Sequence, residues 1–117
     1  MANKKVLVLG AGIMASHMLY RHYDPVYPTT LSNIMVQKKL REELGFKGLI
    51  LTDCLEMKAI ADMYGTSNGA LMAVLAGADI CDISHTLEFQ LKALELLEEA
   101  VNDSISNSSI AKLSIRT

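Results

Sequence analysis

The sequence has few of the features that mark secreted, membrane or nucleic-acid-binding proteins. Its 117 residues include only two cysteines, Cys54 and Cys81, too few for a disulfide framework and typical of a reducing compartment. Eleven basic and 13 acidic residues give a formal net charge of −2 and no electrostatic footprint for nucleic acid. No apolar run approaches the length of a membrane span, and no signal-peptide pattern is evident. We therefore expect a cytoplasmic protein with neither nucleic-acid nor membrane partners.

Apolar residues, by contrast, make up half of the chain, which is enough for one domain with a real core. Short strand-like runs alternate with segments of helical spacing, and this alternation predicts an α/β protein with parallel strands. Segment 12–16 fits either a further strand or the start of a helix. In the final helix Leu91, Leu94 and Leu97 are expected to face inward, and the tail after it to be frayed. Strands are expected over residues 5–9, 49–52 and 78–84, and helices over 32–44, 55–64, 67–75 and 87–101. Ser32 is expected to cap the first of these helices and Gly45 to end it, and either Ser67 or Asn68 to cap the third.

Three of the apolar segments are followed by a polar side chain. The run 49–52 ends abruptly at Asp53, while His17 and His85 follow segments 13–16 and 80–84. Parallel strands end on one rim, where ligands and catalytic groups of α/β proteins gather. A carboxylate and two imidazoles there would suit acid–base or nucleophilic chemistry. Alternatively each of the three side chains only solvates the start of a loop. The wide spacing is a weak zinc signal, so we expect no metal.

A competing motif lies near the start of the chain. Gly10-Ala11-Gly12, followed by Ala15, matches the G-x-G-x-x-A turn that holds a dinucleotide pyrophosphate at a helix N-terminus. The acidic residue expected about 20 positions later on the ribose is absent. A helix opening at Gly12 would support this interpretation, whereas a strand there would oppose it.

Three blocks, residues 13–31, 40–65 and 76–79, resemble glycoside hydrolase family 3, most closely its bacterial β-N-acetylglucosaminidase branch. Their order and spacing match over roughly residues 12–105. The resemblance implies a partial (β/α)8 barrel with three or four strands, and it assigns the nucleophile of a retaining hydrolase to Asp53. It also implies that His17, Met57 and His85 bind the substrate, an N-acetylhexosamine-containing glycan, without a cofactor.

The sequence also departs from that family. The branch's acid/base histidine loop and its sugar-holding Lys-His pair have no counterpart, and Cys54 stands where many members have a second Asp. Residues 1–11 are interpreted as a divergent or foreign N-terminal strand, and 106–117 as a flexible tail. We expect a hydrolase fragment with little or no activity alone, which forms a homo-oligomer through its open sheet edges. The alternative is a non-catalytic α/β module that self-associates or binds a dinucleotide through Gly10-Ala11-Gly12.

Overall fold

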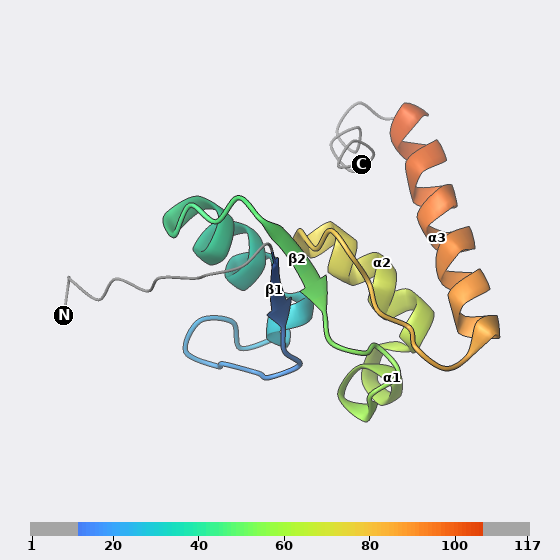
Figure 1. Cartoon of the computed structure of the whole chain (residues 1–117), viewed down its shortest axis with the longest axis horizontal. Helices are drawn as coiled ribbons and strands as arrows, with labels where there is room; N and C mark the ends of the chain where they lie inside the picture. The colour runs from blue at the N-terminus through green and yellow to red at the C-terminus, as the bar shows by residue number, and fades with distance from the viewer. Residues whose placement is uncertain (1–11, 107–117) are drawn as a thin grey trace.

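The computed structural model describes residues 12–106. The expected strand over residues 5–9 and most of the expected tail lie outside these residues. Strands and helices alternate, as the sequence predicts (Figure 1). The elements are β1 (Gly12–Ala15), the 3-10 turn η1 (Thr29–Leu31), η2 (Ile34–Glu43), β2 (Leu49–Thr52), α1 (Lys58–Tyr64), α2 (Thr66–Ala76) and α3 (Leu87–Ser106).

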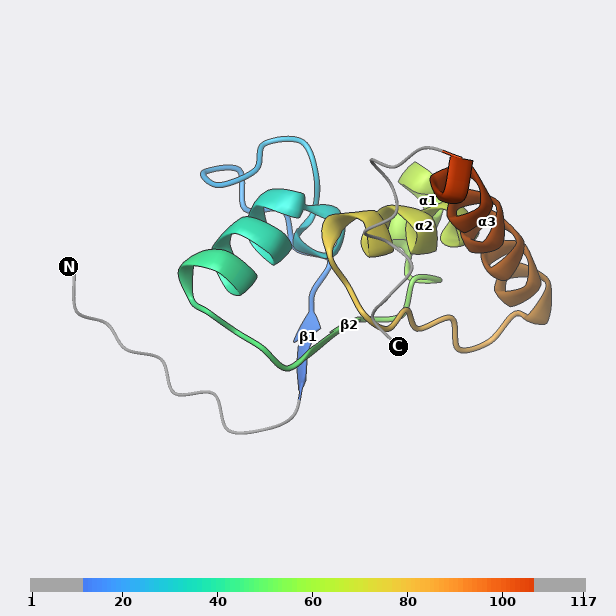
Figure 2. The same cartoon turned by 90° about the horizontal axis from the view of Figure 1, so that it is seen from above.

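The two strands pair in parallel, in the register that aligns Gly12 with Leu49 and Ala15 with Thr52. The strand alternative for residues 12–16 is therefore the one that forms. Helices η2 and α2 lie on one side of the strands, as a turned view shows (Figure 2). This arrangement of parallel strands and covering helices confirms the predicted α/β class with βα units.

The predicted third strand, residues 78–84, is reduced to a single parallel bridge between Leu51 and Ile80. Backbone pairing is present there, because the Thr52 N–H donates to the Ile80 carbonyl at 3.0 Å. The next backbone hydrogen bond of a strand ladder does not form, since the Asp82 N–H donates to the Thr52 side-chain hydroxyl instead of to a strand carbonyl. The segment still runs beside β2 and ends on the same rim.

The helix expected over residues 32–44 forms as the π-helix η2. Ser32 fills its predicted capping role, because its hydroxyl accepts the Met35 N–H at 3.1 Å. At the other end Leu44 donates to the carbonyl of Lys39, five residues back. Gly45 then turns the chain with a φ of 68°, a conformation that favours glycine. The ending at Gly45 is confirmed, but the sequence did not indicate the wider helix.

Helices α1 and α2 form close to the expected places, with shifted starts. Helix α1 begins at Lys58 rather than near Leu55, because the Leu55 N–H donates to the Asp82 carbonyl and the Leu55 side chain is buried. Helix α2 starts at Thr66, so neither Ser67 nor Asn68 caps it as expected, and Ser67 donates its hydroxyl to the Phe89 carbonyl instead.

The inward face of α3 differs from the prediction. Leu91 and Leu94 are 57% and 63% exposed, whereas Ala93 is 5% exposed and packs in the core. Ala70 and Ala73 of α2 belong to the same buried cluster as Ala93, where small side chains allow helices to approach closely. The helix also continues to Ser106 instead of fraying after residue 101. The buried cluster comprises Leu31, Val36, Ile50, Leu55, Ile60, Ala70, Ala73, Ala78 and Ala93. Within residues 12–106 no helix is long and apolar enough to span a membrane.

Candidate active site

Asp53 lies directly after β2, at the carboxyl end of the parallel pair. Its backbone N–H donates to the carbonyl of Ala15, the last residue of β1, at 3.0 Å. One carboxylate oxygen, Oδ1, accepts the Cys54 N–H at 2.8 Å. Among the described residues no donor to Oδ2 is found, so this oxygen remains available for chemistry. The side chain is half-buried, and the strand-end position predicted for it is confirmed.

His17 lies two residues beyond β1 and is joined to the Asp53 segment. Its Nε2 donates to the Cys54 carbonyl at 2.8 Å, and its Nδ1 lies 2.8 Å from the hydroxyl of Thr30. Thr30 is completely buried and also hydrogen-bonds the carbonyl of Ser16 at 2.7 Å. Both ring nitrogens of His17 are thus engaged by the protein. His17 therefore positions the Cys54 backbone, while its predicted contact with substrate stays a prediction.

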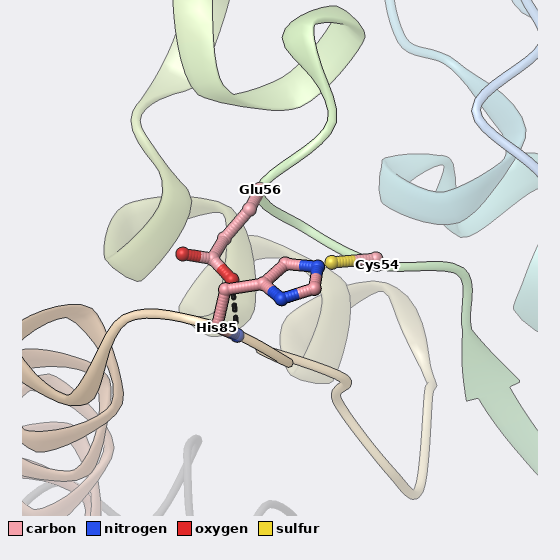
Figure 3. A group of neighbouring side chains, drawn as sticks. All are labelled: Cys54, Glu56 and His85. Carbon is pink, nitrogen blue, oxygen red and sulfur yellow. Dashed lines mark hydrogen bonds between the residues drawn. The ribbon is translucent and has the colours of Figure 1, made fainter.

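His85 follows the segment that bridges to β2, and it approaches the turn after Asp53. Its backbone N–H donates to Oε2 of Glu56 at 2.6 Å. A hydrogen bond from the Thr86 side chain is the main reason that the pKa of Glu56 is lowered; partial burial opposes this effect, and the His85 N–H and ring charge add to it. The sulfur of Cys54, a carboxylate oxygen of Glu56 and a ring nitrogen of His85 lie within 4.8 Å of one another (Figure 3).

The predicted site residues therefore lie on one rim, although only some of them touch. Asp53 and His17 are linked through the backbone of Cys54, and His85 through Glu56. Met57 ends the same turn, where its backbone N–H donates to the Cys54 carbonyl. The Met57 side chain is 47% exposed. Substrate contacts by Met57 and His85 stay predictions. Sequence reasoning missed Thr30, Cys54 and Glu56, whose roles depend on hydrogen bonds between distant segments.

The dinucleotide interpretation required a helix to open at Gly12, and this part of the prediction is wrong. Gly12 begins β1 and pairs with Leu49. A Cβ atom at position 12 would lie 3.3 Å from the Leu49 carbonyl oxygen, so glycine at this position allows the two strands to pack closely. Gly10 and Ala11 lie outside the described residues.

A surface groove of about 660 Å³ between the start of α2 and α3 includes none of the predicted site residues.

Comparison with known proteins identifies the family. Residues 4–115 match the protein-family model described as the glycosyl hydrolase family 3 N-terminal domain. This chain belongs to glycosyl hydrolase family 3. It is 36% identical over 85 residues to a β-hexosaminidase of Vibrio cholerae serotype O1, and the aligned region covers 73% of this chain and 26% of that protein. A β-hexosaminidase of Thioalkalivibrio sulfidiphilus is 31% identical over 103 residues, covering 88% and 29%.

Solved structures give the same assignment to family 3. A family 3 β-N-acetylglucosaminidase from Paenibacillus sp. superposes with a TM-score of 0.80 at 41% identity, covering 88% of this chain and 20% of that chain. The β-N-acetylglucosaminidase from Thermotoga maritima gives 0.73 at 26% identity, covering 91% and 23%. The βα units described here are thus part of the family 3 barrel. The chain spans about a quarter of the length of the curated relatives it matches. The predicted boundary at residue 11 stays a prediction.

Proposed function

We propose that this chain supplies the nucleophile of a retaining glycoside hydrolase that acts on β-linked N-acetylhexosamine, and that Asp53 is that nucleophile. The observation that supports this most directly is the position of Asp53 at the carboxyl end of β2. In (β/α)8 barrels this end of the strands holds the catalytic groups. The names of the relatives, β-hexosaminidase and β-N-acetylglucosaminidase, support the substrate class.

The hydrogen bonds around Asp53 suit a nucleophilic carboxylate. The Cys54 N–H holds Oδ1, which orients the group and leaves Oδ2 to attack the anomeric carbon. As the new C–O bond forms, the bond to the aglycone breaks and its electron pair leaves on the aglycone oxygen, which a general acid protonates. Water then attacks the same carbon, gives a proton to the conjugate base of that general acid, and releases the Asp53 carboxylate. Because the chain spans a quarter of its relatives, further groups of the complete barrel are needed for protonation and for sugar positioning.

An aryl N-acetyl-β-glucosaminide with an acidic phenol tests the nucleophile without a general acid, since its phenolate leaves unprotonated. The chain should release phenolate slowly, and Asp53→Asn should abolish release without changing the circular dichroism spectrum. Asp62→Asn, on the exposed surface of α1, serves as the matched control. Natural β-linked disaccharides should remain uncut. Rapid cleavage of a natural disaccharide would mean that His17 or His85 acts as a general acid.

A chimera removes the dependence on the isolated chain. Residues 12–105 would replace the matching quarter of the Vibrio cholerae β-hexosaminidase, so that the rest of the barrel is present. We expect this chimera to hydrolyse the aryl substrate, and a 5-fluoro glycosyl fluoride to label the peptide that contains Asp53. An active chimera in which Asp53→Asn leaves hydrolysis unchanged, or in which the label lies on another residue, would overturn the assignment.

A further inference from the structure

We propose that Cys54, Glu56 and His85 form a binding site for Zn²⁺ or a similar borderline divalent cation. Three different ligand types converge there, a sulfur, a carboxylate oxygen and an imidazole nitrogen, all within 4.8 Å of one another. Figure 3 shows the ring of His85 between the Glu56 carboxylate and the Cys54 sulfur, with one ring nitrogen beside the sulfur. This proposal does not depend on whether Asp53 is the nucleophile.

The spacing is close to that of a tetrahedral zinc site. Zinc binds sulfur at about 2.3 Å and nitrogen or oxygen at about 2.0–2.2 Å, which places pairs of ligand atoms about 3.4–3.6 Å apart. The three atoms would therefore need to approach by at most about 1.4 Å, within reach of small side-chain rotations. Three protein ligands leave the fourth coordination position to water, which can reach the site because these side chains are half-buried or exposed.

The two segments that provide the ligands are already held together. The Cys54 backbone is fixed on both sides, because its N–H donates to Asp53 and its carbonyl accepts from the His17 ring. The Glu56 carboxylate accepts the backbone N–H of His85 at 2.6 Å. A cation would thus bind between two loops that are joined before it arrives, which reduces the ordering cost of binding.

The ligand set indicates which cations fit. Thiolate and imidazole ligands favour zinc, cobalt or copper, whereas magnesium and calcium prefer sites built entirely from oxygen. The second cysteine shows the contrast within the same chain. Cys81 lies 3.5 Å from the Ala70 carbonyl, and burial raises the pKa of its thiol to about 11. Cys81 is therefore a suitable control for non-specific binding to thiols.

Cobalt titration of the complete chain, kept reduced with a phosphine, tests the proposal. We expect a sulfur-to-cobalt charge-transfer band that saturates at one equivalent and that Zn²⁺ abolishes. Cys54→Ser should remove the band. Glu56→Gln and His85→Gln should each weaken Zn²⁺ binding at least tenfold, since even outer-shell partners of metal sites contribute 10- to 100-fold. Cys81→Ser and His22→Gln should bind as the unaltered chain does.

Circular dichroism would show that each variant is folded, and Glu56→Gln retains an oxygen that can accept the His85 N–H. The proposal is overturned if the unaltered chain gives no charge-transfer band. It is equally overturned if folded Glu56→Gln and His85→Gln bind Zn²⁺ with unchanged affinity, or if the band depends on Cys81 instead of Cys54.

Discussion

Asp79→Ala should destabilise the fold by about 3–5 kcal/mol, the usual cost of removing one partner from a buried ion pair. Arg41 of η2 and Asp79, in the turn before the Ile80 bridge, form such a pair, with side chains 9% and 8% exposed. The guanidinium also donates to the carbonyls of Gly48 and Phe46, and Asp79 accepts the Ile50 N–H at 2.9 Å. Without Asp79 the Arg41 charge stays buried and the Ile50 N–H loses this acceptor.

The structure separates the charge effect from the hydrogen-bond effect. Asp79→Asn keeps an oxygen for the Ile50 N–H and removes only the charge, so it should cost less than Asp79→Ala. Adding Arg41→Met to Asp79→Asn also removes the Arg41 charge, which Asp79→Asn leaves buried without its carboxylate partner. The double variant with Asp79→Asn should cost at least about 1 kcal/mol less than the sum of the two single variants, because the residues are in contact. Small domains are stable by only about 5–15 kcal/mol, so Asp79→Ala alone would remove a large part of the total.

Urea unfolding followed by far-ultraviolet circular dichroism measures these differences, which suits a chain that has no tryptophan. The exposed pair Lys39–Glu43, with side chains 39% and 60% exposed, provides the control. Glu43→Gln should cost less than about 0.5 kcal/mol, as exposed i,i+4 pairs do. If Asp79→Ala costs no more than Glu43→Gln, the Arg41–Asp79 pair is screened by water and the reasoning is refuted.

Burial would raise the pKa of Asp24, but hydrogen bonds from Ser32 and from two backbone N–H groups outweigh the effect of burial and lower the pKa. The stability that ionised Asp24 contributes should therefore be present above pH 3.8, the pKa of the unfolded state, and be lost as the pH falls below that value. Asp24→Ala should flatten that loss in acid unfolding curves. Gly69→Ala should destabilise by about 1–3 kcal/mol despite better helix propensity, because its Cβ would lie 2.5 Å from Ile60; thermal unfolding that shows it as stable as Asn68→Ala would contradict this. The unpaired edge of β1 among the described residues predicts dimers or larger species, and a monomer at high micromolar concentration in sedimentation would contradict it.

The sequence predicted those parts of the fold that depend on local pattern. The apolar run into Asp53 identified β2 and its carboxyl end, and the glycine at residue 45 identified the end of η2. Parallel pairing followed from the alternation of strands and helices. The strand end and the helix end need only the residues of one segment, and the parallel pairing needs only the order of the segments along the chain.

Other features depend on partners that are distant in sequence. The third strand shortens because the Thr52 hydroxyl takes the Asp82 N–H, a side-chain acceptor that strand periodicity does not encode. On α3 the helical period was right, but the buried face is set by α2, which accepts Ala93 and leaves Leu91 and Leu94 exposed. Helical spacing identifies a face only when it is known what covers it.

The site shows the same division between local and distant causes. Asp53 could be found from its own strand, but its orientation depends on residues of two other segments. Buried Thr30 hydrogen-bonds the His17 ring, and His17 holds the Cys54 carbonyl beside the carboxylate. From the other side, His85 holds Glu56 in the same turn. Because the His17 ring holds the backbone that follows the nucleophile, a change at Thr30 should alter the position of Asp53 without touching it, whereas a side-chain change at His85 leaves its backbone N–H bonded to the Glu56 carboxylate.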